Sequence, residues 1–233
     1  MTPISFIYNI PLWLIDLWMG EFGRDKTEDL CAWFNEQPKL TARINTILID
    51  IPQCLTMLDE QGWSVTQDSN YEDIIYINSH RGSLEKSEAF IKGYITFMDK
   101  ASMLVARLVN PQPGERILDC CAAPGGKSMY MATLMNNVGS LMSCDIHEHK
   151  IELMNSNADR LGASIVHTKV QDATKLPDSW NSYFDRVLVD APCSGLGILQ
   201  KKLDMRWRKQ ESILSELPPL QLAILERAAM TVK

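Results

Sequence analysis

The pattern of apolar and polar positions changes near residue 90 of this 233-residue chain. Before that point, short stretches alternate between a period of about 3.6 residues, typical of amphipathic helices, and a period of about 2, typical of half-buried strands. The segments that predict helices are 11–19, 25–36 and 53–60, and those that predict strands are 43–51, 62–66 and 74–78. We expect a small α+β domain over residues 1–90.

From residue 91 onward the pattern predicts a domain of a different class. Four apolar strand candidates follow one another, and helical stretches separate them, which is typical of βαβ units with a parallel sheet. The strand candidates are 116–121, 140–146, 164–170 and 184–190, and the helical stretches are 102–108, 127–136, 147–161 and 173–177. Right-handed crossovers bring the carboxyl ends of such strands to one edge, where these sheets bind ligands. We therefore expect an α/β domain over residues 91–233.

The composition is that of a water-soluble globular protein, with 45% apolar and 22% charged residues. The six cysteines include no Cys-x-x-Cys pair, which argues against a zinc site and suits a reducing compartment. The apolar stretch 1–19 has no cationic region before it and is interrupted by Pro3, Pro11 and Asp16, so we expect neither a signal peptide nor a membrane span. We predict a cytoplasmic protein with no metal site and no membrane partner.

The net charge of −6 is unevenly distributed along the chain. Residues 1–105 carry a net charge of −7, whereas residues 106–233 carry +1. This balance argues against a surface that binds polyanions everywhere. A local basic patch stays open as an interpretation, with a solvated charged loop as the alternative, because five basic residues fall within nine positions. They are Lys201, Lys202, Arg206, Arg208 and Lys209.

A glycine pair lies where the first strand of the second domain is expected to turn into a helix. Gly125 and Gly126 follow the apolar segment 116–121. Glycines at such a turn let the backbone approach a ligand closely and expose helix N-terminal N–H groups to a polar or anionic group. The loop matches neither the Gly-x-Gly-x-x-Gly fingerprint nor the Walker spacing. By itself it is a weak indicator of a site.

Three aspartates follow the other three strand candidates in turn. Asp145 lies 20 residues after Gly125, where a carboxylate can accept hydrogen bonds from a ribose diol. Asp172 is placed to accept from an adenine amino group, and Asp190 ends the fourth strand. Each of them could instead cap the helix that follows it. Three such acids beside one glycine loop predict a nucleoside pocket.

Two of these segments resemble the motifs of a known enzyme family. Leu118-Asp-Cys-Cys-Ala-Ala-Pro-Gly-Gly-Lys127 and Asp190-Ala-Pro-Cys-Ser-Gly-Leu-Gly197 strongly resemble RNA cytosine-5 methyltransferases of the Nol1/Nop2/Sun type. Residues 11–51 resemble the N-terminal part of the bacterial members that act on small-subunit ribosomal RNA. The resemblance covers nearly the whole chain. Further stretches that look like family segments are 93–104, 204–207 and 220–225.

The resemblance implies a fold, a cofactor and a partner. The fold is a Rossmann-like S-adenosylmethionine-dependent methyltransferase core preceded by a small α+β RNA-binding subdomain. The cofactor is S-adenosylmethionine, and the partner is RNA, with small-subunit ribosomal RNA and its processing as the expected context. The positions that the resemblance assigns to the cofactor pocket are Cys121, Ala122, Ala123, Pro124, Gly125, Gly126, Lys127, Asp145, Asp172 and Asp190.

An RNA partner gives the basic cluster at 201–209 a role. If RNA binds there, Lys201, Lys202, Arg206 and Arg208 are expected to contact its backbone and to make binding depend on salt. Trp207, within the same cluster, could stack on a base or could anchor the loop to the core.

The family's chemistry uses two cysteines. Cytosine C5 is a poor nucleophile, so a cysteine thiolate adds to C6 and makes C5 reactive enough to attack a methyl group; a base then removes the C5 proton and the thiolate leaves. The resemblance assigns product release to Cys193. Asp190, beside the target base, could hydrogen-bond its N3 and N4 edge, so these two are the expected catalytic residues. The attacking cysteine of the family lies in a later Thr-Cys motif, and no Thr-Cys dipeptide occurs in these 233 residues.

The missing motif allows two main interpretations. In the first, the chain is a methyltransferase that stops after the fourth strand and a helix at 220–232, so it is expected to be inactive alone. In the second, it is a noncatalytic RNA- or cofactor-binding remnant. An amino-methyltransferase is a third interpretation, which Cys193 argues against because those enzymes place an aromatic residue there. A sheet without its fifth strand would leave 184–190 with an open apolar edge, through which we expect self-association.

Overall fold

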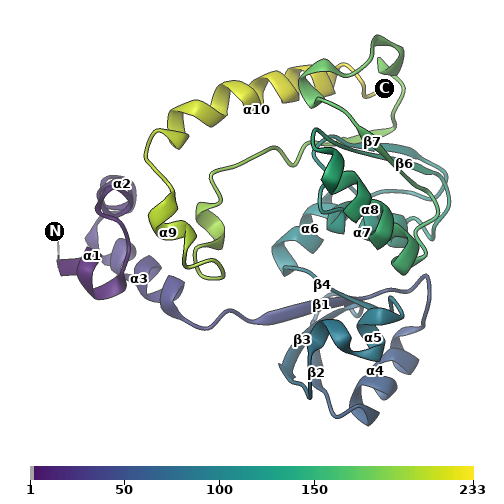
Figure 1. Cartoon of the computed structure of the whole chain (residues 1–233), viewed down its shortest axis with the longest axis horizontal. Helices are drawn as coiled ribbons and strands as arrows, with labels where there is room; N and C mark the ends of the chain where they lie inside the picture. Colours follow the sequence, from purple (N-terminus) through teal and green to yellow (C-terminus); the bar gives the residue numbers. More distant parts are fainter. Residues whose placement is uncertain (1–2) are drawn as a thin grey trace. The chain divides into compact units, whose positions relative to one another are not determined.

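The computed structural model describes residues 3–233, which divide into two compact units (Figure 1). The first unit takes in the chain up to Pro38 together with Pro192–Leu222, and the second takes in Lys39–Ala191 together with Ala223–Lys233. The chain therefore passes from the first unit into the second, returns to the first at Pro192, and enters the second again at Ala223. These units do not follow the boundary expected at residue 90.

The first unit is helical. Its helices are α1 (Pro3–Tyr8), α2 (Leu12–Phe22), α3 (Arg24–Asn35), α9 (Met205–Arg208) and the first part of α10 (Ile213–Ala229), with the 3-10 turn η4 (Leu196–Ile198). Gly23 separates α2 from α3 at a φ of +77°, a conformation that favours glycine. Apolar residues three or four positions apart supply the core of this unit, among them Leu14, Trp18, Cys31 and Phe34.

The second unit begins with a four-stranded antiparallel sheet in the order β2-β3-β1-β4 (Figure 1). Alternate strand residues, such as Ala42 and Ile44, share a buried core with Cys54 and Leu58 of a covering helix. The elements are β1 (Leu40–Ile44), α4 (Ile51–Glu60), β2 (Ser64–Gln67), β3 (Ile74–Ser79), η1 (Leu84–Lys86), α5 (Glu88–Ile91) and β4 (Ile95–Phe97). This β-α-β-β-α-β succession is a ferredoxin-like domain.

The rest of the second unit is built on a parallel sheet in the order β7-β6-β5-β8. Ile117 and Leu141 share a core with three helices, whereas Leu118 and Cys144 belong to another core that includes Ile224 of α10. Helices therefore cover both faces, which confirms the expected Rossmann-like α/β fold. The elements are α6 (Lys100–Leu108), β5 (Arg116–Asp119), α7 (Gly126–Leu134), β6 (Ser140–Asp145), α8 (Glu148–Leu161), β7 (Val166–Val170), η2 (Ala173–Lys175), η3 (Asp178–Trp180) and β8 (Arg186–Leu188).

A buried polar cluster ties α7 to the ferredoxin-like domain. Arg43 of β1 is fully buried, donates through Nη1 to Thr133 Oγ1 of α7 at 3.2 Å, and lies 5.1 Å from the centre of the Tyr130 ring. The Tyr130 hydroxyl donates to Asp73 Oδ2 at 2.7 Å and accepts from Arg107 Nε of α6 at 2.6 Å. Because α7 starts at the glycine loop, this cluster fixes the helix on which that loop is built.

The strand expected over 43–51 ends at Ile44 because the next residue, Asn45, is held by other contacts. Its Nδ2 donates to the carbonyl oxygens of Gly93 and Leu161, both at 2.9 Å, and its Oδ1 accepts from the Ile47 backbone N–H. Such side-chain bonds compete with the strand ladder. The isoleucines that suggested an alternating pattern therefore lie in a turn and at the start of α4.

Several other boundaries differ from the sequence prediction. Strand β4 was not expected, because three residues are too short for a periodicity to register. Helix α10 starts well before residue 220 and contains Pro218 and Pro219, residues that normally indicate a helix end. In place of the helix expected over 173–177, Ala173–Lys175 form a short 3-10 turn, and β8 ends at Leu188 instead of residue 190.

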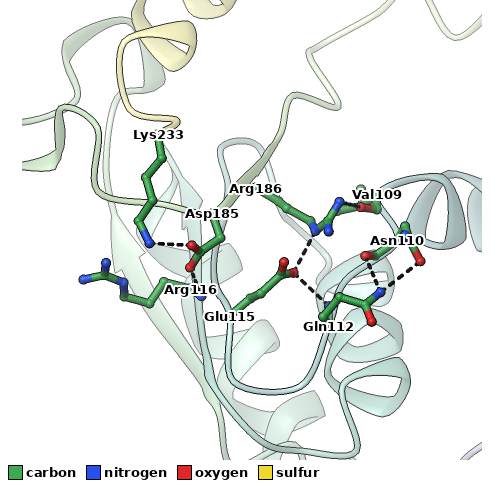
Figure 2. A network of polar contacts seen from close by, with 8 residues as sticks. All are labelled: Val109, Asn110, Gln112, Glu115, Arg116, Asp185, Arg186 and Lys233. Carbon is green, nitrogen blue, oxygen red and sulfur yellow. Dashed lines mark hydrogen bonds and ion pairs between the residues drawn. The ribbon is translucent and has the colours of Figure 1, made fainter.

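The final residues of the chain pair with the segment that leads into β8. Phe184 and Val232 form a parallel bridge, and the Lys233 N–H donates to Phe184 O at 3.0 Å. The Lys233 side chain forms an ion pair with Asp185, whose other oxygen accepts from the Arg116 N–H at 2.8 Å (Figure 2). The edge that was expected to be open is therefore partly paired within the chain.

Within residues 3–233, no helix is both long and apolar enough to cross a membrane. In that same range, no cluster of three or more His, Cys, Asp or Glu side chains could hold a metal ion.

Candidate cofactor site

The glycine loop lies at the carboxyl end of β5. The strand ends at Asp119, and a short loop leads into α7. Gly125 adopts a φ of +93°, and a Cβ atom there would lie 3.2 Å from Met129 Cε. The Ala122 N–H donates to Cys144 O at 2.8 Å, which ties the loop to β6. The loop thus has the tight strand-to-helix turn that the glycine pair predicted.

Asp119, at the end of β5, was not singled out by the sequence analysis, although it is the most deeply buried acid of the site. It is 0% exposed. Its Oδ2 accepts from Ser128 Oγ at 2.7 Å, whereas its Oδ1 is buried without a hydrogen-bond partner. Burial raises the pKa of this carboxyl to about 6, and the charge of Asp190 adds to the rise. The signal that could have found it is its place at a strand end, like the other three aspartates.

Lys127 and Asp190, from the two central motifs, meet in the structure. The Lys127 Nζ lies 2.6 Å from Asp190 Oδ2. Lys127 is in the first turn of α7, and Asp190 lies just beyond β8, so the parallel pairing of β5 with β8 brings the two segments together. Asp190 keeps 48% of its side chain exposed, so the pair does not bury the carboxylate.

Asp145 ends β6, the strand beside β5, and is 7% exposed. Its Oδ1 accepts from the His147 backbone N–H at 3.0 Å and lies 3.5 Å from Lys150 Nζ. Both of these contacts use the same carboxylate oxygen. Asp145 thus lies at the carboxyl end of a central strand, and its contact with ribose hydroxyls stays a prediction.

Asp172 follows β7 and caps the turn η2. Its Oδ1 accepts from the Thr174 backbone N–H at 2.9 Å and from Thr174 Oγ1 at 2.7 Å, and its Oδ2 lies 3.7 Å from Lys175 Nζ. The hydrogen bonds from Thr174 are the main cause that lowers the pKa of this carboxyl. For Asp172, the structure therefore shows the capping role that was the alternative interpretation.

Burial acts on the thiols of the cysteines in β6 and in the loop after β5. Burial raises the pKa of Cys121 to about 12 and that of Cys144 to about 12, and it raises the pKa of Cys120 as well. A thiol in this state is a poor nucleophile. Cys193 is exposed and belongs to the other compact unit, three positions along the chain from Asp190.

The basic cluster at 201–209 divides into buried and exposed members. Arg206 is 2% exposed, so the expectation that it contacts RNA is wrong. Its guanidinium donates to the carbonyl oxygens of Leu199 and Phe34 and, through Nη1, to Asn35 Oδ1 at 2.7 Å and to Tyr8 O at 3.3 Å. These acceptors include carbonyl oxygens at the C-terminal ends of α1 and α3, which have no partner within their helices. One guanidinium can bind several of them because its N–H donors point in different directions.

The second unit gathers four acids at one edge of the parallel sheet. Asp119 and Asp145 end β5 and β6, and Asp172 and Asp190 lie two residues beyond β7 and β8. The acids supply acceptors for hydroxyl and amino groups, and the first turn of α7 supplies N–H donors. Such an edge suits a ligand that carries a positive charge, a diol and a small anionic group.

Two family models match this chain. The model described as 16S rRNA methyltransferase RsmB/F matches residues 106–233. The model described as the ferredoxin-like domain of RsmF/B-like methyltransferases matches residues 10–82.

Curated relatives match nearly the whole chain. It is 39% identical over 224 residues to the probable ribosomal RNA small subunit methyltransferase B of Bacillus subtilis, covering 96% of this chain and 50% of that protein. It is 34% identical to the protein of the same description from Synechocystis, covering 97% of this chain and 51% of that protein. The chain thus spans about half the length of these relatives.

A solved structure is also similar over the whole chain. The crystal structure of PH0851 matches with a TM-score of 0.93 and 32% sequence identity. The match covers 100% of this chain and 53% of that chain.

Proposed function

The chain belongs to the RsmB/F family of 16S rRNA methyltransferases, and on that basis we propose that it binds S-adenosylmethionine and RNA as part of an enzyme that methylates cytosine C5. The proposed substrate is small-subunit ribosomal RNA, the class of RNA in the names of its relatives. The observation that carries the proposal is the set of strand-end acids around the glycine loop. A cytoplasmic location stays a prediction.

The chemistry of the site fits S-adenosylmethionine. This cofactor carries an ammonium, a sulfonium, a ribose diol and an adenine amino group, so its pocket needs acceptors and a negative potential. Asp119 offers a buried carboxylate oxygen without a partner, and the contacts of Asp145 leave its second oxygen to a ligand. The left-handed turn at Gly125 allows close approach of the backbone.

We assign the cofactor contacts to residues of the second unit. Asp145 would accept from the ribose hydroxyls, Asp172 from the adenine amino group through the oxygen that its cap does not use, and Asp119 from a nitrogen donor. The segment Cys121–Lys127 and Asp190 would complete the pocket. When bound, the cofactor supplies an electrophilic methyl group.

Asp190 and Cys193 are the proposed catalytic residues. Asp190 would hydrogen-bond the N3 and N4 edge of the cytosine and stabilise charge that develops there. Its ion pair with Lys127 at 2.6 Å supports this role, since it holds the carboxylate next to the glycine loop. Cys193 would assist product release, as the family resemblance implies.

We further propose that these 233 residues bind the cofactor without transferring its methyl group. The family's attacking thiolate lies in a Thr-Cys motif, and the sequence contains no such dipeptide. The buried cysteines do not replace it, because their raised pKa values keep them protonated.

Calorimetry with S-adenosylmethionine tests the cofactor proposal. We expect Asp145→Ala to weaken binding by about 1–3 kcal/mol, because the ligand's donors lose a charged acceptor. Asp159→Ala is the matched control, since it removes the same charge from an exposed position of α8. A folded wild-type chain that binds no cofactor would overturn the proposal, and equal affinity of the Asp145 variant would move the ribose contact elsewhere.

Tritiated methyl transfer to unmodified small-subunit RNA tests the catalytic proposal. The 233-residue chain is compared with a chain that also carries the Thr-Cys segment of a family member. We expect transfer only by the second. Robust transfer by the first, abolished by Cys193→Ser, would identify Cys193 as the nucleophile and contradict the assignment above. Cofactor and RNA binding without transfer by either chain would favour a noncatalytic binding protein.

A further inference from the structure

Helix α9 presents an exposed tryptophan directly beside a buried arginine. Arg206 is 2% exposed and its guanidinium is satisfied by oxygens of the first unit, whereas its neighbour Trp207 is 57% exposed. Trp207 therefore does not anchor the loop to the core, and that alternative from the sequence is wrong. More than half of its side chain is open to solvent, so a ligand can reach the ring.

Two exposed basic residues lie close to Trp207 along the chain. Lys202 is exposed, and the side chain of Arg208 is 77% exposed although it lies 3.3 Å from Asp204. We call Lys202, Trp207 and Arg208 the α9 surface. Two of its three residues are basic, whereas the chain as a whole carries a net charge of −6.

We propose that the α9 surface binds single-stranded RNA, with Trp207 stacking on a base and Lys202 and Arg208 contacting phosphates. The proposal rests on the RNA partner proposed above and adds the residues and the mode of contact. Base stacking on an aromatic ring together with nearby cations is how proteins hold single strands, because every base has a π face and every nucleotide a negative charge. The exposed cations of the same short segment are the charge complement of that ligand.

Arg206 supports this role as a positioning residue. A four-residue helix such as α9 is too short to be stable by itself. The bonds from Arg206 to Phe34 O and Asn35 Oδ1 hold it against α3. The surface is therefore formed before the ligand arrives, which lowers the entropy cost of binding.

Fluorescence anisotropy with a labelled single-stranded RNA of about ten nucleotides, within the usual site size, tests the proposal. We expect Trp207→Ala to weaken binding about tenfold with an unchanged salt slope, and Trp207→Phe to keep most of the affinity, because the ring contributes by stacking. Binding should also quench tryptophan emission in the wild type more than in Trp207→Phe.

Charge variants supply the second measurement. The slope of log affinity against log salt is negative, and each phosphate contact on a single strand contributes about 0.7 to its magnitude. Lys202→Gln and Arg208→Gln should therefore each reduce that magnitude by about 0.7. Arg24→Gln is the matched control, because it removes the same charge from an exposed ion pair with Glu28 on α3. Its slope should equal that of the wild type.

The outcomes separate this inference from the proposed function. RNA binding by the wild type with equal affinity for Trp207→Ala overturns the α9 surface and leaves the RNA partner standing. No RNA binding by a wild type that binds S-adenosylmethionine overturns both this surface and the RNA partner. Sedimentation as a dimer that Trp207→Ala makes monomeric, with RNA affinity unchanged, shows that a second copy covers the ring and also overturns the proposal.

Discussion

Among single residues, burial decides what a charge does in this protein. Arg206 and Arg208 are two positions apart, yet the first satisfies backbone oxygens in the interior and the second lies in solvent. Asp119 and Asp190 both lie at strand ends, yet Asp119 is buried, which raises its pKa, whereas Asp190 keeps 48% of its side chain exposed. Two residues of the same type therefore differ in the partners that their charges can reach.

Asp119→Asn should change how stability depends on pH. In the wild type the folded-state pKa of about 6 exceeds the ordinary value of 3.8, so the native state binds the proton more tightly than the unfolded state. Stability should therefore fall as pH rises from about 4 to about 6 and stay lower above that range. Asn does not titrate, so the variant lacks this loss. The difference in free energy of unfolding, variant minus wild type, should therefore increase by about 2–3 kcal/mol between pH 4 and pH 6. Urea unfolding of both proteins at several pH values measures this difference. The same difference at every pH would contradict a raised pKa at Asp119.

Arg206→Met should destabilise the first unit by about 2–4 kcal/mol, because buried carbonyl oxygens lose their donor. Arg208→Met is the control. Its side chain is exposed and its pair with Asp204 is a surface ion pair, so the expected loss is below about 0.5 kcal/mol. Thermal and urea unfolding give both values. Equal effects for the two variants would mean that the Arg206 bonds do not hold α9.

Among the elements, α7 connects the two halves of the second unit. Its first turn carries the glycine loop and Lys127, while Tyr130 and Thr133 meet the ferredoxin-like domain. Close packing supports the same junction, because a Cβ atom on Gly93 would lie 2.0 Å from Arg160 O of α8. The ferredoxin-like domain is thus a fixed part of the second unit.

Tyr130→Phe should lower the free energy of unfolding by about 1–2 kcal/mol, because Asp73 loses a donor and Arg107 an acceptor in the interior. Tyr183→Phe is the control. The Tyr183 ring lies on Arg116 at 4.1 Å and is 43% exposed, so losing its hydroxyl should cost below about 0.5 kcal/mol. Chemical denaturation measures both free energies of unfolding. An unchanged value for Tyr130→Phe would show that the Tyr130 hydrogen bonds do not stabilise this junction.

Across the whole molecule, the sheet edge beside β8 is the feature open to association. Residues 231–233 pair only with the segment before β8, and β5 is the one strand neighbour of β8 in the described parallel sheet. A strand edge with free N–H and C=O groups is a template for pairing with a second chain. The ion pair between Lys233 and Asp185 holds the covering residues in place (Figure 2).

We expect the chain to dimerise reversibly as its concentration rises, through this edge. Lys233→Glu should strengthen dimerisation, because two acids would repel and release the final residues from Phe184. Lys233→Gln should have a smaller effect, since it removes the attraction without adding repulsion. Sedimentation velocity over a range of concentrations measures this, and a monomer at every concentration for all three proteins would count against association through the edge.

The sequence alone predicted the α+β and parallel α/β fold classes, the glycine turn at Gly125 and the succession of strand-end aspartates, because periodicity, left-handed turns and strand ends are local properties of the chain. The tertiary structure decided what depends on distant partners. The strand at 43–51 stopped at Asn45 because that side chain bonds to Gly93 and Leu161, far along the sequence. Arg206 was buried because the ends of α1 and α3 needed donors. No local pattern records which distant carbonyl oxygen a side chain will meet, so burial of a charge could be known only from the fold.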